Sequence, residues 1–138
     1  MEAPLNVPML IRRVILVAAI SIVANLLLTA IGKNISQPPS SFGPYMNTSV
    51  VILTLVGVVG AGAVYAFMRT YIRNVVKANR YFVWLSVVVL ILSLYPDVAM
   101  PWSSDPDQVG WTYGIIANLM LMHVIAGVAA MYFYTRPE

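Results

Sequence analysis

Four long apolar stretches constrain this chain more than any other feature of its sequence. They cover about residues 10–31, 48–68, 81–100 and 113–134. A helix rises about 1.5 Å per residue, so roughly 20 apolar residues span the hydrocarbon core of a bilayer. None of the stretches alternates apolar and polar residues with period two, which argues against the strands of a β-barrel. We therefore predict an all-α integral membrane protein, a four-helix bundle with up-down-up-down order, in a single domain over residues 1–138.

Composition supports a lipid environment. Hydrophobic residues make up 60% of the chain and charged residues 9%, against roughly 25% charged residues in a typical soluble domain. The mean hydropathy is +0.82. Too few charged side chains are present to cover a water-exposed surface, so we expect the lipid bilayer to be the main partner of the protein.

The basic residues predict the orientation of the spans. Seven of the eight fall on one side of the predicted bundle, and Lys33 falls on the other. The seven are Arg12, Arg13, Arg69, Arg73, Lys77, Arg80 and Arg136. An excess of Lys and Arg marks short cytoplasmic loops. We expect a multi-pass protein of the plasma (inner) membrane with both termini in the cytoplasm. We expect no nucleic-acid partner, because the positive charge lies at span ends and not on a polar domain.

The first span also begins with Arg12 and Arg13, as a signal peptide would. Its apolar stretch exceeds the usual length of about 7–15 residues, so we expect it to be retained as an anchor. Aromatic residues are expected to form belts at the two membrane surfaces. The predicted belts contain Trp102, Trp111 and Tyr113 on the outer side and Tyr81, Tyr132 and Tyr134 on the inner side.

Polar residues within the spans are the candidates for function, because an unsatisfied polar group in lipid is costly. Ser21, Asn25 and Thr29 repeat every four residues and form one stripe on the first span. On the third span, Ser86, Ser93 and Asp97 share a face. The candidate ligand-binding residues, brought together in an outward-opening polar cavity, are Asn25, Thr29, Thr54, Asp97, Asn118 and His123.

Each of these residues also has a structural interpretation. The Ser, Thr and Asn side chains suit hydrogen bonds that hold helices together. Asp97 follows Pro96 at the end of a span, where water would solvate its carboxylate. His123 needs a partner at its depth, and Asn118 points about 140° away from it on one helix. Small residues are expected at helix contacts, namely Gly57, Ala61, Ala126 and Ala130.

Several chemistries lack their residues. There is no cysteine and only one histidine, so thiolate sites, paired haem ligands and a multi-ligand zinc site are not expected. No lysine lies inside a span, and no Ser/His/Asp arrangement or phosphate-binding glycine loop occurs. We therefore expect no metal, no cofactor and no enzymatic activity.

Three short motifs are similar to those of a known family. They are Ala24-Asn25-Leu26-Leu27, LSLYPD at 92–97 and MHVIAGVAA at 122–130. The chain resembles a family of small bacterial four-helix membrane proteins described only as a domain of unknown function. The resemblance extends over nearly the whole chain and implies a bacterial inner-membrane protein with four spans. It implies no activity.

The sequence leaves functions of different classes open. The first is an accessory or interaction protein that packs against itself or a larger membrane complex. The alternative is a binder or transporter of a small amphipathic molecule that uses the polar cavity. A third is a proton-linked carrier in which His123 titrates. If Asn25 and Asp97 converge inside the bundle, a cavity is favoured; if they face outward, a partner interface is favoured.

Overall fold

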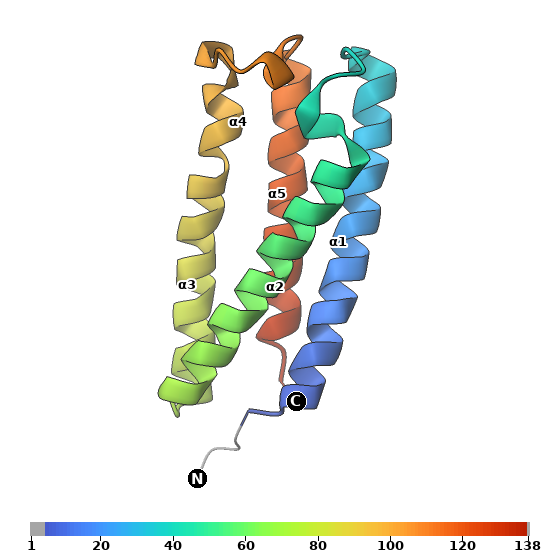
Figure 1. Cartoon of the computed structure of the whole chain (residues 1–138). Helices are drawn as coiled ribbons and strands as arrows, with labels where there is room; N and C mark the ends of the chain where they lie inside the picture. The colour runs from blue at the N-terminus through green and yellow to red at the C-terminus, as the bar shows by residue number, and fades with distance from the viewer. Residues whose placement is uncertain (1–4, 138) are drawn as a thin grey trace.

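The computed structural model describes residues 5–137, and all of its regular structure in that range is helical (Figure 1). The long helices are α1 (Val7–Ser36), α2 (Asn47–Tyr71), α3 (Val75–Ser93) and α5 (Tyr113–Tyr134). A short helix, α4 (Tyr95–Ala99), follows α3, and single turns form η1 (Gly43–Tyr45), η2 (Met100–Trp102) and η3 (Pro106–Gln108). Helix α1 begins and α5 ends at the same end of the bundle, which we call the terminal end. The turns η1 and η3 lie at the opposite end, which we call the loop end.

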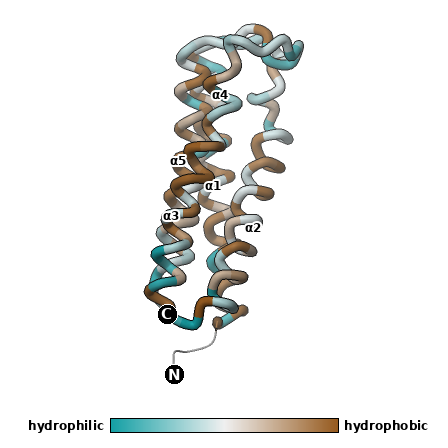
Figure 2. Tube along the Cα trace, turned by 90° about the vertical axis from the view of Figure 1, so that its left-hand side faces the viewer, coloured by the Kyte–Doolittle hydropathy of each residue, from teal (hydrophilic) through white to brown (hydrophobic). Residues whose placement is uncertain are grey.

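Four helical segments are long and apolar enough to cross a membrane. They are Val7–Ser36, Asn47–Tyr71, Val75–Trp102 and Tyr113–Tyr134, so each predicted span is found and most extend beyond the predicted bounds. Hydrophobic residues occupy the middle of the helices, and hydrophilic residues gather toward the two ends of the bundle (Figure 2). The prediction of an all-helical architecture is confirmed.

Polar side chains fix where the helices begin. The side chains of Asn6, Asn74 and Thr112 accept hydrogen bonds from backbone N–H groups in the first turns of α1, α3 and α5. Such caps satisfy donors that have no partner inside the helix. Gln37 ends α1 in the left-handed region, with φ of 41°. The side-chain caps set the first residues of α1, α3 and α5.

The third span is interrupted near its loop end. Helix α3 ends at Ser93, and α4 begins at Tyr95 with Pro96 in its first turn. Proline has no N–H to continue the helical hydrogen bonds. Ser93 Oγ donates to Leu90 O at 2.7 Å, which occupies a carbonyl close to the break. The interruption reorients the chain after Leu94 and brings Asp97 into the bundle.

The terminal half of the bundle is tightly packed around Tyr134. The side chain of Tyr134 is fully buried, and its hydroxyl donates to Val58 O at 2.9 Å. The prediction that Tyr134 belongs to a surface belt is wrong, because its ring lies between Tyr65 and Phe82. Gly62 allows α2 to approach closely here, since a Cβ at this position would lie 2.6 Å from Val14 Cγ2.

Arg13 ties the end of the chain to α1. Its guanidinium donates to the carbonyls of Tyr134, Arg136 and Pro137 at 3.2, 2.9 and 3.2 Å. These carbonyls belong to the last residue of α5 and to residues that follow it, so no backbone N–H of the helix donates to them. The contact fixes the position of α5 against α1 at the terminal end.

Helix α2 is tilted across the bundle (Figure 1). At the terminal end it lies beside α3, where Tyr65 Oη donates to Asn79 Oδ1 at 2.8 Å. Toward the loop end it lies beside α1 and away from α3. The prediction that Gly57 forms a helix contact is therefore wrong: no atom lies within 4 Å of a Cβ built there. Ala130 is buried as predicted, but Ala126 borders the space left by the tilt of α2.

Candidate functional site

A cavity of about 240 Å³ lies between α2, α3 and α5 where α2 leaves α3. Most of its wall is apolar. Helix α2 contributes Leu53, Gly57 and Ala61, α3 contributes Val89 and Leu90, and α5 contributes Leu119, Met122 and Ala126, among others. Five polar side chains complete the wall: Asn25, Thr54, Ser86, Ser93 and His123. The cavity therefore combines an apolar body with a small polar region.

Asn25 reaches the cavity from α1, the helix farthest from its opening. Its Nδ2 donates to Thr54 Oγ1 at 3.0 Å, and the residue is only 5% exposed. Its Oδ1 has no hydrogen-bond partner. A buried polar atom without a partner costs about 1–3 kcal/mol. Asn25 thus places a buried amide in the cavity wall and bonds α1 to α2.

Thr29 and Ser21 complete the polar stripe of α1 but do not line the cavity. Thr29 Oγ1 donates to the backbone oxygen of Asn25 at 2.9 Å and is buried. Ser21 Oγ is buried without a partner. The stripe is on the inside of the bundle as its spacing predicts, but Thr29 serves its own helix and is not part of the candidate site.

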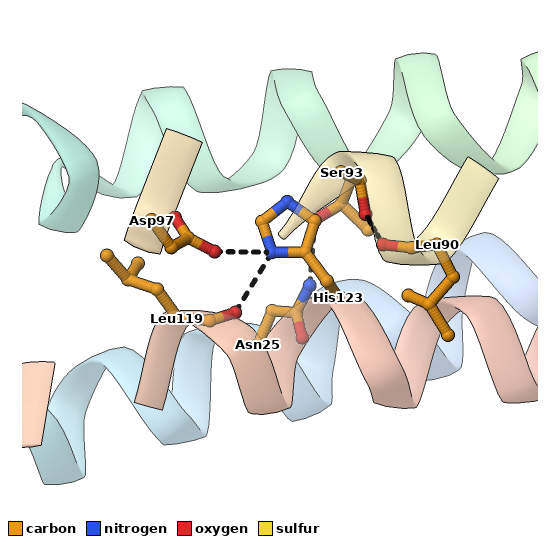
Figure 3. A network of polar contacts seen from close by, with 7 residues as sticks. Asn25, Leu90, Ser93, Asp97, Leu119 and His123 are labelled. Carbon is orange, nitrogen blue, oxygen red and sulfur yellow. Dashed lines mark hydrogen bonds and ion pairs between the residues drawn. The ribbon is translucent and has the colours of Figure 1, made fainter. Parts of the chain in front are cut away.

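His123 and Asp97 form the charged part of the site (Figure 3). Nδ1 of His123 lies 3.3 Å from Asp97 Oδ2 and 3.0 Å from Leu119 O. The Asp97 side chain is 9% exposed and the His123 side chain 41% exposed. The interpretation of Asp97 as a water-solvated span end is wrong. The break between α3 and α4 turns its carboxylate toward α5, where His123 is its partner.

The contact with Leu119 identifies the protonated ring nitrogen of His123. A backbone carbonyl can only accept a hydrogen bond, so Nδ1 carries a proton and donates to Leu119 O. The same N–H lies near Asp97 Oδ2, which is buried and has no well-aligned hydrogen bond. The second nitrogen, Nε2, points away from both Leu119 and Asp97 (Figure 3). His123 therefore joins a buried carboxylate on one side to the cavity on the other.

Asn118 lies in a different cluster at the loop end. Its Nδ2 donates to Leu28 O at 2.9 Å and to Tyr45 Oη at 2.7 Å. Burial raises the pKa of the Tyr45 hydroxyl, and the hydrogen bond with Asn118 opposes this by a smaller amount. Tyr45 stays a neutral phenol that closes η1 over α1 and α5. Asn118 and His123 thus point to separate places, as their spacing predicts.

The six candidate residues therefore divide into two groups. Asn25, Thr54 and His123 line the cavity, and Asp97 supports His123 from behind. Thr29 and Asn118 bond elsewhere. The sequence did not identify the carbonyl of Leu119 as a partner of His123, because a backbone group leaves no signal in a residue pattern. Its position four residues before His123 on a helix is the one available clue.

No group of three or more residues suited to holding a metal ion occurs within residues 5–137. Comparisons of the chain with family models, curated proteins and solved structures gave no match. The resemblance to a family of small bacterial membrane proteins thus stays a prediction. Function has to be argued from the geometry of this chain.

Proposed function

We propose that the protein is a multi-pass protein of a bacterial inner membrane, with its terminal end in the cytoplasm. The four apolar segments support membrane insertion. Seven of the eight Lys and Arg residues lie in the first two turns of α1 or α3, in the last turn of α2, or in the segments that follow α2 and α5. All of these places lie at the terminal end. This distribution supports a cytoplasmic terminal end by the positive-inside rule.

Within that membrane, we propose that the protein binds a small molecule with an apolar body and one polar group. The observation that carries this proposal is the convergence of Asn25, Thr54 and His123 on one mostly apolar cavity. Ligand sites commonly combine an apolar wall with a few polar groups that orient the ligand.

The size and position of the cavity limit what it holds. Its volume of about 240 Å³ lies below the roughly 300–1,000 Å³ of sites for drug-sized ligands. It is bordered by exposed residues of α2 and α3, such as Leu53 and Val89, so it opens between these helices. In a membrane this opening faces the bilayer. A short-chain amphiphile, or the head of a longer one whose tail stays in lipid, fits these limits.

Photo-crosslinking in bilayers tests this proposal. An alkyl diazirine probe is expected to label cavity-lining residues of α5, such as Met122 and Ala126, and excess nonane is expected to compete with it. The matched variants are Gly57→Leu and Gly60→Leu. Both positions lie on α2 with open space around them, but only Gly57 lines the cavity.

Gly57→Leu is expected to fill the cavity and remove the competed labelling, whereas Gly60→Leu is expected to keep it. Leucine raises the helix propensity equally at both positions, so this effect does not distinguish the two variants. Labelling that nonane does not reduce, or that both variants keep, would contradict a binding cavity. The proposal involves no reaction step and no cofactor.

An accessory role in a larger assembly is the second candidate. Gly60 supports it, because the residue is exposed and no atom lies within 4 Å of its Cβ position. A glycine on an apolar helix allows a second helix to pack closely in a membrane. The protein has no cysteine, so a single Gly60→Cys variant reports this surface cleanly. Shielding of that thiol from a membrane-permeant maleimide in native membranes, lost after purification, would support a partner helix.

A further inference from the structure

The charges around the ring of His123 determine which protonation state this ring presents to the cavity. Among residues 5–137, Asp97 is the one charged residue that contacts the ring. The other elements around the cavity contribute uncharged groups: Asn25 from α1, Thr54 from α2, and Ser86 and Ser93 from α3. No Lys or Arg lines the cavity. The charge of the buried Asp97 carboxylate therefore has to be balanced by His123 or by a proton of its own.

A protonated Asp97 fits this geometry poorly. Nδ1 of His123 already carries a proton for Leu119 O, so it cannot accept one from Asp97 Oδ2. A proton on Oδ1 would leave Oδ2 free to face Nδ1–H, but that proton would have no acceptor among residues 5–137. A neutral His123 beside an ionised Asp97 would leave a buried negative charge without compensation, which is costly. An imidazolium beside a carboxylate balances the two charges, because Nδ1 donates to Leu119 O and lies 3.3 Å from Asp97 Oδ2. In that state Nε2 also carries a proton.

We propose that the cavity selects a neutral carbonyl compound, an apolar ketone, ester or quinone-like molecule whose oxygen accepts a hydrogen bond from Nε2–H of a protonated His123. This inference rests on the proposed ligand-binding function and names its ligand class. Asp97 already neutralises the imidazolium, so a ligand carboxylate would bring a second negative charge into the same apolar site. A neutral acceptor avoids that cost. His123 lines the cavity and its side chain is 41% exposed, with Nε2 on the side of the ring that faces away from Asp97 (Figure 3).

The single histidine of the chain gives a direct spectroscopic test. In protein labelled with ¹⁵N-histidine in bilayers at neutral pH, both ring nitrogens are expected to show a bonded proton. Asp97→Asn is expected to remove the proton from Nε2 and keep the one on Nδ1. Asp105→Asn is the matched control, because Asp105 is an exposed acid in the same connection before α5. A neutral ring in the unmodified protein would overturn the proposal.

Competition against the diazirine probe tests the ligand class. The competitors are methyl heptyl ketone, the matching secondary alcohol, nonane and nonanoate. A hydrogen bond from a charged donor contributes about 1.5–3 kcal/mol, so the ketone is expected to compete at least about tenfold better than nonane. In Asp97→Asn the ketone is expected to lose this advantage. The alcohol is expected to keep its advantage over nonane in this variant, because its hydroxyl can donate a hydrogen bond to the unprotonated Nε2.

The outcomes separate this inference from the function on which it rests. If no compound competes, both are contradicted. If nonane competes as well as the ketone, the binding cavity stands and the carbonyl inference is overturned. Stronger competition by nonanoate than by the ketone would also overturn it, because the site would then favour a negative charge.

Discussion

The two halves of this bundle contain the same kinds of residue, but one half is packed and the other borders a cavity. In the terminal half, α2 meets α1, α3 and α5 through Gly62, Tyr65 and a fully buried Tyr134. In the loop half, α2 lies beside α1 and away from α3, and Gly57 faces open space. The first arrangement fills its interior, and the second leaves a cavity bordered by polar groups. Hydrophobicity therefore does not distinguish the two halves; the tilt of α2 does.

The hydrogen bonding of buried polar side chains differs between the terminal end and the cavity. Tyr65 and Tyr134 use their hydroxyls to bond α2 to α3 and α5 at the terminal end. Near the cavity, by contrast, Asn25 Oδ1 and Asp97 Oδ2 have no hydrogen bond. Hydrogen-bonded polar groups stabilise a packed interior.

The largest effect is expected at Tyr134. Tyr134→Ala removes a fully buried ring and its hydrogen bond to Val58 O, so the free energy of unfolding is expected to fall by about 3 kcal/mol. Tyr134→Phe keeps the ring and is expected to cost about 1 kcal/mol. Unfolding by a denaturing detergent measures both. Equal stability of the alanine variant and the parent would show that the terminal half is not the packed core.

A glycine pair on α2 compares the halves directly. Gly62→Leu places its side chain against Val14 and Tyr134, and overpacking of this kind costs roughly 1–3 kcal/mol. Gly57→Leu enters the cavity and is expected to change stability by less than about 1 kcal/mol, since it also gains helix propensity. The same unfolding measurement serves here. A larger loss at Gly57 than at Gly62 would reverse the proposed difference.

A smaller effect is expected for the buried pair. His123→Leu leaves Asp97 without its partner, and the expected loss of stability is about 1 kcal/mol. Adding Asp97→Asn is expected to recover part of this loss, because the uncompensated carboxylate is then removed. A double-mutant cycle gives the coupling energy of the two residues. Strictly additive losses would mean that the two side chains do not interact.

The last prediction concerns orientation and is expected to leave stability unchanged. Single cysteines at Ser41 and Ser104, both exposed at the loop end, are expected to react with an impermeant thiol reagent added outside intact cells. A cysteine at exposed Arg73, in the turn between α2 and α3, is expected to react only after the membrane is opened. The opposite pattern would invert the proposed orientation.

The sequence predicted the helices well because apolar length is a local property. It also predicted that the stripe of Ser21, Asn25 and Thr29 faces inward, since its spacing of four is a helical period. It misjudged Asp97, Gly57 and Tyr134 for one shared reason. Their environments depend on how neighbouring helices are placed, on the break after Ser93 and on the tilt of α2. Neither the break nor the tilt can be read from the residue pattern of a single helix.

The cavity itself was predicted as a polar space, and it is mostly apolar. Polar residues on separate helices were expected to converge, and three of the six candidates do so. Thr29 and Asn118 instead satisfy local partners. Small and apolar residues supply most of the wall, and such residues look the same in sequence whether they pack or line a space.

The central claim is that the space between α2, α3 and α5 holds a ligand, and crystallography with a heavy-atom probe tests it most directly. Crystals grown from a lipid phase would be soaked with a bromine-labelled long-chain methyl ketone. The account predicts an anomalous bromine peak within the cavity bordered by Gly57, Ser86 and Ala126, and its loss in Gly57→Leu but not in Gly60→Leu. Bromine only on the outer surface of the helices, with the cavity filled by the protein's own side chains, would contradict it.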